Sequence, residues 1–142
     1  MWYNIYKDKK EKELIFLLLR YRIREAYYQF KFRCQRFIRG YADEDVWSMD
    51  MWFIEGMQKL LPKYIKKTDG YPGTITAEEW HEILNEMLSY LDGMTEEGAE
   101  KQLFGETENL TIKQIRQIEE YMVQCKEEFF ALYTKWFYHL WY

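Results

Sequence analysis

Apolar side chains recur every three or four residues along much of the chain, which is the period of an amphipathic helix. The first such stretch predicts a helix over about residues 10–39, after a Lys-rich start that is expected to fray. Its apolar stripe consists of Phe16, Leu19, Ile23, Tyr27, Phe30, Cys34 and Phe37. Polar and aromatic residues also alternate over residues 27–34, which is the period of a strand, so a short strand there stays open as an alternative.

A second helix is predicted to begin near Glu44. Its buried face is expected to consist of Trp47, Met51, Ile54, Leu61 and Ile65, with Met57 beside them. Pro62 lacks a backbone N–H and its ring clashes with the preceding turn, so the helix should kink or break there. The string DGYPG at residues 69–73 is a turn signal that closes the segment.

Two later predicted helices begin with the same N-terminal capping motif. Thr76 with Glu79, and Thr111 with Gln114, have the spacing of a capping box, in which the two residues exchange side-chain and backbone hydrogen bonds. Gly93 is expected to end the first of these helices. The predicted buried faces are Trp80, Ile83, Leu84, Met87, Leu88 and Leu91 on the first helix, and Ile115, Ile118, Met122, Cys125, Phe129, Leu132 and Trp136 on the second.

The acidic residues 94–110 predict a short helix near residues 96–104 or, alternatively, a mobile loop. Together the patterns predict an all-α fold, a bundle of about four helices with short connections. A length of 142 residues suggests a single helical domain over residues 1–142. If a strand forms near residues 27–34, the class becomes α+β.

Near the C-terminus, apolar residues spread around the whole predicted helix. They are Trp136, Phe137, Tyr138, Leu140, Trp141 and Tyr142. A helix that is apolar on every side must be covered. The cover is expected to come from the rest of the chain, from a second copy in a homo-oligomer built through this helix, or from a partner.

The junction between the first two predicted helices carries charges that suit helix ends. Gly40 favours a helix stop because glycine enters the left-handed conformation without a Cβ clash. Arg36 and Arg39 precede it in the last turn, where positive charge is favourable. Asp43 is predicted to cap the next helix, with Asp45 in its first turn.

Two interpretations of this junction follow. The simpler one is a helix–turn–helix corner, with Trp47 as an anchor in the core. The other is a functional polar pocket in which Asp43, Asp45 and Asp50 face the two arginines. Three carboxylates also suit a hard cation, although helix-start electrostatics explains two of the three more simply.

The net charge of -4 hides an uneven distribution of charge. Residues 1–40 carry 11 Lys/Arg against 4 Asp/Glu, whereas residues 41–142 carry 9 against 20. The two halves either neutralise each other, or the basic half faces an anion and the acidic half a basic partner. Arg22, Arg33 and Arg36 lie close together behind the apolar stripe, among tyrosines on which bases could stack, so nucleic-acid binding is a further hypothesis.

No motif carries recognisable chemistry. Glu78 and His81 form half of a di-iron motif whose other half is missing, so no metal or other cofactor is predicted. Cys34 and Cys125 sit in apolar stripes and are interpreted as reduced core thiols. The chain is therefore predicted not to be an enzyme. No signal peptide is recognised and the longest apolar run has six residues against the ~20 that span a bilayer, which predicts a cytoplasmic protein with no membrane partner.

Three strings occur in order: RGYADEDVWSMD at residues 39–50, GYP at residues 70–72 and EEW at residues 78–80. Together they resemble a group of small phage and prophage proteins, most of them uncharacterised. The resemblance covers about residues 36–88. It implies a viral origin, and hence the cytoplasm of an infected bacterial host, but no known reaction.

Aromatic residues make up 20% of the chain, more than a core of this size can bury with every polar tip satisfied. Exposed Tyr, Trp and Arg are enriched in binding hot spots. The predicted binding residues are Arg33, Arg36, Arg39, Tyr41, Asp43, Asp45, Trp47, Asp50, Tyr71, Trp136 and Trp141.

The leading functional hypothesis is a phage-encoded binding protein that antagonises a host defence or host factor, by contact with a host protein or by sequestering a nucleotide signal. One alternative is a nucleic-acid-binding accessory protein that uses the basic first helix. A second alternative is an enzyme with an unrecognised site.

Overall fold

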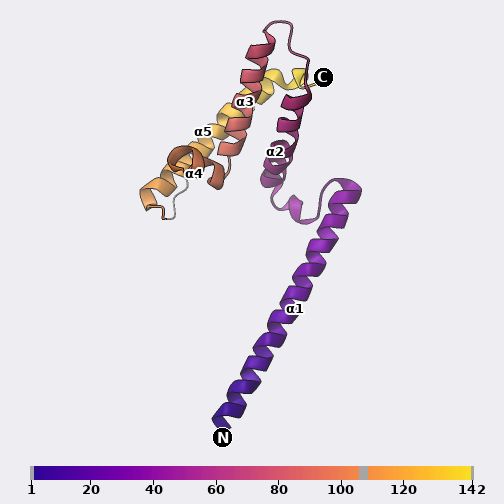
Figure 1. Ribbon diagram of the computed structural model, residues 1–142, viewed down its shortest axis with the longest axis vertical. Helices are drawn as coiled ribbons and strands as arrows, with labels where there is room; N and C mark the ends of the chain where they lie inside the picture. Colours follow the sequence, from indigo (N-terminus) through magenta and orange to yellow (C-terminus); the bar gives the residue numbers. More distant parts are fainter. Residues whose placement is uncertain (1, 106–108, 142) are drawn as a thin grey trace. The chain divides into compact units, whose positions relative to one another are not determined.

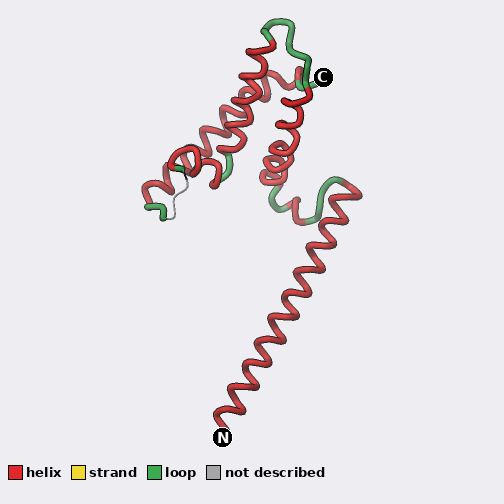
Figure 2. The backbone as a smooth tube through the Cα atoms, in the orientation of Figure 1, coloured by secondary structure: helices red, strands yellow, loops and turns green. Residues whose placement is uncertain are grey.

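The computed structural model describes the backbone of residues 2–105 and 109–141, and the side chains of residues 13–105 and 109–141. All regular structure in these ranges is helical (Figure 2), which confirms the all-α prediction. Residues 27–34 lie inside a helix, so the alternative of a strand is wrong. The elements are α1 (Trp2–Arg39), the 3-10 turn η1 (Glu44–Val46), α2 (Met49–Lys67), α3 (Ala77–Gly93), α4 (Glu96–Phe104), α5 (Ile112–Trp136) and the 3-10 turn η2 (Phe137–His139).

The contacts divide the chain into two compact units. The first unit is Met1–Met49, which contains α1 and η1, and the second is Asp50–Tyr142, which contains nearly all of α2 and the elements after it. Each unit is described below by itself. A single domain spanning residues 1–142 stays a prediction.

The first unit is dominated by α1, which begins at Trp2 and not near residue 10. Its 38 residues correspond to a length of about 57 Å. The helix ends at Gly40 as predicted: Gly40 has φ +81°, and its N–H donates to the Arg36 carbonyl at 3.0 Å. An L-residue in that conformation would be strained, which explains the glycine.

The second helix begins at Met49 and not at Glu44, because the acidic side chains expected to start it are used differently. Asp43 makes no side-chain capping bond. Asp45 instead accepts from the Ala42 N–H at 2.6 Å, which stabilises the single 3-10 turn η1. Trp47 follows this turn and is 91% exposed, so its predicted role as a core anchor is wrong.

The second unit is built on α3 and α5, which pack side by side, with α4 against both (Figure 1). Trp80, Leu84, Met87 and Leu91 of α3 meet Phe129 and Trp136 of α5 and Ile54 and Leu61 of α2 in one apolar core. Phe53 of α2 adds to the contact with α5. The centroid of its ring lies 6.1 Å from the ring centroid of Phe129 and 5.7 Å from that of Phe130. The predicted buried faces of α3 and α5 supply most of this core.

Helix α2 continues past Pro62 to Lys67, so it does not break there, and the alternative of a kink stays a prediction. Leu61 is buried beside the proline, and burial of such a side chain contributes about 1.5–3 kcal/mol, which offsets much of the roughly 3 kcal/mol that a proline costs inside a helix. The buried face of α2 differs from the predicted one at the start of the helix, where Met51 is 41% exposed.

Both predicted capping boxes are present, at Thr76 with Glu79 and at Thr111 with Gln114. The segment between α3 and α5 forms the short helix α4, so the alternative of a mobile loop over residues 96–104 is wrong. Gly93 is the last residue of α3, but its role is close packing: a Cβ atom there would lie 2.5 Å from Cys125 Sγ.

Candidate functional site

The junction after α1 is held by a bidentate ion pair. The Arg36 guanidinium donates to Asp45 through Nη2 at 2.5 Å and through Nε at 3.2 Å. Its Nη2 also donates to Glu44 Oε1 at 2.8 Å. Asp45 also accepts a hydrogen bond from the Ala42 N–H. Arg36 therefore connects the last turn of α1, through Asp45, to the loop that follows it.

Asp43 receives three side chains from the last turns of α1. Gln35 Nε2 donates to it at 2.7 Å, Lys31 Nζ lies at 3.2 Å, and Arg39 forms an ion pair with it. The Asp43 N–H returns a bond to Gln35 Oε1 at 3.0 Å. Arg39 also donates to the Tyr41 carbonyl at 3.1 Å, with its guanidinium 4.7 Å from the Tyr41 ring centroid.

These contacts keep both aspartates ionised. The hydrogen bond from Gln35, followed by those from Arg39 and Lys31, lowers the pKa of Asp43 from 3.8 to about 2. The hydrogen bond from Arg36, assisted by the Ala42 N–H, lowers the pKa of Asp45. The same pair raises the pKa of Arg36. The corner is therefore a set of mutually neutralised charges at neutral pH.

We expect Asp43 to titrate near pH 2. Because its pKa is lower in the folded state than the unfolded value of 3.8, its ion pairs stabilise the corner above about pH 4. That contribution is lost as the pH falls toward 2. An NMR titration of the Asp43 Cγ resonance measures this midpoint, and Gln35→Ala should move it upward. A midpoint near 3.8 in the unmodified chain would contradict the described contacts.

The predicted polar site is thus only partly assembled. Asp43 and Asp45 face Arg39 and Arg36 as expected. Asp50 lies in the first turn of α2, in the second unit. In the part of the chain with described side chains, Arg33 has no carboxylate partner, and no group of three His, Cys, Asp or Glu residues is placed to hold a metal.

The apolar stripe of α1 has an arrangement that sequence reasoning missed. Phe16, Ile23, Phe30 and Phe37 stand at seven-residue intervals, and their exposed fractions are 65%, 71%, 68% and 91%. The sequence pattern predicts this stripe as the apolar face of an amphipathic helix. The described part of the first unit contains no element that covers it. The seven-residue repeat was the available signal, because it is the spacing of a helix that packs along another helix.

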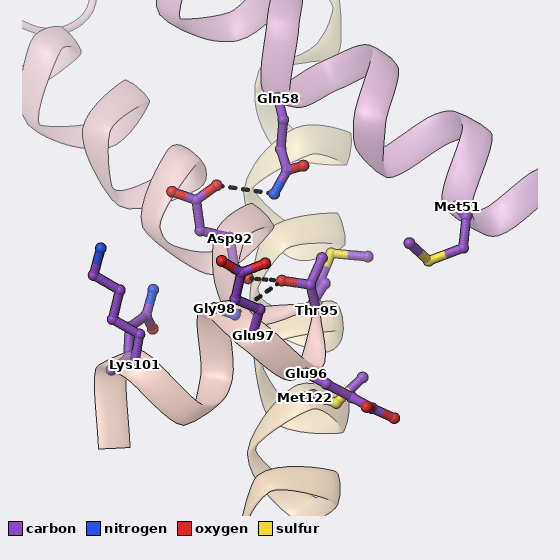
Figure 3. Close-up of a pocket in the computed structure, with 11 residues that line it drawn as sticks. Met51, Gln58, Asp92, Thr95, Glu96, Glu97, Gly98, Lys101 and Met122 are labelled. Atoms are coloured by element: carbon purple, nitrogen blue, oxygen red, sulfur yellow. Dashed lines mark hydrogen bonds between the residues drawn. The ribbon is translucent and has the colours of Figure 1, made fainter. Parts of the chain in front are cut away.

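A hollow of about 860 Å³ in the second unit lies where α2, α3, α4 and α5 approach one another (Figure 3). Gln58 of α2 donates to Asp92 of α3 at 3.0 Å. Thr95 caps α4 by accepting from the Gly98 N–H at 3.1 Å, and its hydroxyl donates to the Asp92 carbonyl at 2.9 Å. These polar groups join the helices to one another. Glu96 and Glu97 also line the hollow, but among the described residues they belong to no group of carboxylate, His or Cys side chains placed to hold a metal ion.

Two smaller hollows adjoin each other at the GYP turn. One, about 260 Å³, is lined by residues 70–73 together with His139 and Trp141. The other, about 160 Å³, shares Gly70 and Tyr71 and is closed by Thr68, Asp69, Ala77, Trp80 and His81. The fold therefore brings together two predicted binding residues, Tyr71 and Trp141, that are far apart in sequence.

The tail that carries Trp141 is fastened to α2. The Tyr64 hydroxyl donates to the Trp141 carbonyl at 3.0 Å and, more weakly, to the His139 carbonyl at 3.3 Å. Trp136 is buried and its ring lies 5.4 Å from that of Trp80, so it supports this site from the core and is not itself a surface residue. An oligomer through the C-terminal helix stays a prediction.

The two cysteines differ in burial. Both are free thiols, as predicted, but only Cys125 is in the core, while Cys34 is half-buried on α1. Burial raises the pKa of Cys125, so its thiol stays protonated at neutral pH. Glu78 and His81 are both exposed.

Within the described residues, no helix combines the length and apolar character needed to span a membrane. No protein-family model matches the chain, and comparisons with curated proteins and with solved structures give no match either.

Proposed function

We propose that the protein is a phage-encoded binding protein that antagonises a host factor in the bacterial cytoplasm, by packing α1 against an acidic amphipathic helix of a host protein. The observation that supports this most directly is the exposed row of large apolar side chains at seven-residue intervals on α1. The viral origin rests on the resemblance of the RGYADEDVWSMD, GYP and EEW strings to phage and prophage proteins.

The size of the apolar face suggests a modest affinity from burial alone. Phe16, Ile23, Phe30 and Phe37 occupy one position of a heptad, with Leu19, Ala26 and Arg33 three residues after the first three of them. Burying one large apolar side chain contributes about 1.5–3 kcal/mol, so four contribute about 6–12 kcal/mol. Association costs about 4–15 kcal/mol, a range that overlaps the gain, so a further favourable term would strengthen binding.

Charge supplies that term and selects the partner. Arg20 and Arg22 flank the apolar row, and Arg33 follows Leu19 and Ala26 in the neighbouring row of the heptad. In a parallel pair of two copies of α1, the two Arg33 side chains would meet in the seam, which is unfavourable. A helix with Glu or Asp at the facing positions would form ion pairs instead. The geometry therefore favours an acidic helix over self-association.

The nucleic-acid alternative is supported less. Lys31, Arg36 and Arg39, three of the cations that would contact phosphates, already bind Asp43, Glu44 and Asp45. Phosphate contacts would have to compete with these pairs. Binding through the remaining arginines predicts a steep loss of affinity with salt.

The proposal is tested with the full chain and a designed peptide, an amphipathic helix with Leu at the heptad core positions and Glu on both flanks. Fluorescence anisotropy measures the dissociation constant. Ile23→Asp should raise it about tenfold or more, because a carboxylate would be buried in the apolar seam beside other acidic groups. Tyr21→Asp is the matched control, since Tyr21 is similarly exposed but lies on the opposite side of α1, and it should change the constant less than twofold.

Three results would overturn the proposal. One is equal weakening by the two variants. Another is a dimer in sedimentation that Ile23→Asp dissociates, which would assign the face to a second copy. The third is strong protection of α1 amides from hydrogen exchange that Ile23→Asp abolishes in the monomer, which would assign the face to the rest of the same chain.

The host component is tested by photo-crosslinking from Phe30 in infected cells. A crosslinked host protein that carries an acidic amphipathic helix, and that is lost with Ile23→Asp, is the expected result. Crosslinks that persist in the variant count against a host partner on this face.

A further inference from the structure

Methionine side chains from three segments line the hollow between α2, α3, α4 and α5 (Figure 3). Met51 comes from α2, Met94 follows the end of α3, and Met122 comes from α5. Met51 is 41% exposed and the other two are half-buried, so all three keep surface that a ligand can contact. Methionine is flexible and polarizable, and surfaces rich in it adapt to apolar side chains of different shapes. This lining therefore suits the aliphatic side chains of a partner.

Carboxylates accompany this apolar lining. Asp92, Glu96 and Glu97 line the same hollow, and among the described residues that line it Lys101 is the only cation. Of the ion pairs that the described side chains form, none involves any of these three carboxylates. In this they differ from Asp43, which pairs with cations of α1. The hollow therefore carries a net negative charge.

The helix ends beside the hollow do not reverse this charge. Helix α3 ends at Gly93 and α4 begins at Glu96, so the negative end of one helix dipole lies close in sequence to the positive end of the other, and the two offset each other. The Gly98 N–H, in the first turn of α4, already donates to Thr95 Oγ1 at 3.1 Å. The hollow is therefore expected to attract cations and to repel anions.

The size and openness of the hollow favour a peptide over a small ligand. Its volume of about 860 Å³ lies near the upper end of the range of about 300–1,000 Å³ for small-molecule sites. Met51, Glu96 and Glu97 are exposed, so the hollow is accessible from solvent. An apolar groove with charged edges binds one face of an amphipathic helix. We propose that this hollow binds a basic amphipathic helix of a partner protein, whose aliphatic side chains contact the three methionines and whose Lys or Arg side chains pair with Glu96 and Glu97.

This site is independent of the proposed docking face on α1. All of the residues that line the hollow belong to the second unit. The two sites also select peptides of opposite charge, since the face on α1 is proposed to bind an acidic helix. Failure of either peptide to bind therefore leaves the other proposal standing.

The test uses the full chain, labelled with ¹³C at its methionine methyl groups, and a designed helical peptide with Leu on one face and Lys on the others. Saturable shifts are expected for the methyl groups of Met51, Met94 and Met122. The methyl group of Met87, which is fully buried in the core, should not move. Because ion pairs contribute to binding, the dissociation constant should rise with salt concentration.

The apolar contact is tested by Met51→Ala, which should raise the dissociation constant about fivefold or more because contact surface is lost. Met49→Ala is the matched control. Met49 begins the same helix and is 68% exposed, but it does not line the hollow, so its replacement should change the constant less than twofold.

The charged contact is tested by Glu97→Gln, which removes the charge and keeps the shape of the side chain. It should raise the constant about two- to fivefold and make it less sensitive to salt. Glu127→Gln is the matched control, because Glu127 is an exposed carboxylate of α5 outside the hollow, and it should change the constant less than Glu97→Gln does.

Five results would overturn the inference. The first is the absence of saturable shifts of the three methyl groups up to about 1 mM peptide. The second is equal weakening by Met51→Ala and Met49→Ala. The third is equal affinity for a peptide of the same composition without an apolar face, which would show unspecific attraction to an acidic surface. The fourth is spermine that shifts the same methyl groups and displaces the peptide, which would assign the hollow to a small organic cation. The fifth is a dimer in sedimentation that Glu97→Gln dissociates, which would assign the hollow to a second copy.

Discussion

Replacing Phe129 with alanine is expected to lower the free energy of unfolding of the second unit by about 3–5 kcal/mol. Phe129 is fully buried on α5. Its ring stacks on Tyr133 at 5.5 Å and meets the edges of Phe53 and Phe130 at 6.1 Å and 5.3 Å. The loss combines the transfer free energy of the ring with the cavity that it leaves.

Urea unfolding followed by tryptophan fluorescence measures this change in the full chain. Phe130→Ala is the control, because Phe130 is the next residue, has the same chemistry and is 41% exposed. It should cost at most about half as much, since less of its ring leaves water on folding. Equal losses for the two variants would contradict the described orientation of α5.

Replacing Gly98 with alanine is expected to disrupt the junction of α3 and α4. A Cβ atom there would lie 1.9 Å from the Asp92 carbonyl oxygen and 2.9 Å from Thr95 Oγ1. The first of these atoms is backbone, so no side-chain rotation relieves the clash. We expect a loss of at least about 1–3 kcal/mol, with lower hydrogen-exchange protection across α4.

Two other glycines provide graded controls for this substitution. Gly56 in α2 has open space around its Cβ position, so Gly56→Ala should stabilise the helix by about 0.4–1 kcal/mol. Gly93→Ala should be intermediate, because its nearest clash is with the side chain of Cys125. In the double variant with Cys125→Ala, part of the Gly93→Ala loss should disappear, because Sγ is then absent. Similar losses at all three glycines would show that the close approach at Gly98 is not the cause.

The face on α1 and the hollows at the GYP turn differ in what they require of the protein. The face on α1 needs only a continuous helix with its row of large apolar side chains. The hollows at the GYP turn need α2, α3 and the tail to be correctly packed, since Tyr64, Trp80 and Trp141 come from different segments. Core variants such as Phe129→Ala should therefore disturb the hollows at the GYP turn while leaving peptide binding by α1 nearly unchanged.

Sequence reasoning succeeded where the physical cause is local. The Thr76–Glu79 capping box was predicted in full because both of its bonds join residues three apart. The helical period in α3 and α5 is also local, so their buried faces were largely found. Local signals gave a wrong prediction at Glu44. The carboxylates there predict a helix start, but they form ion pairs with Arg36 in the last turn of α1.

The candidate sites could be predicted only in part, for the same reason. Arg36, Arg39, Asp43 and Asp45 are close in sequence, and their pairing was anticipated. Tyr71 and Trp141 were each singled out as exposed aromatic residues, but nothing in the sequence indicated that they line one hollow. The unpartnered indole N–H of Trp80 was also invisible, because satisfaction of a buried donor depends on every neighbour in space.

By itself, the sequence determined the helical class, most helix ends and the charge pairs of the corner, since all of these follow from interactions within a few residues. Only the tertiary structure decided which apolar stripes are buried. The stripes of α1 and α5 have similar periods, yet Phe129 is fully buried and Phe37 is 91% exposed. Burial depends on what packs against a face, and a helical period specifies the face but not the neighbour that covers it.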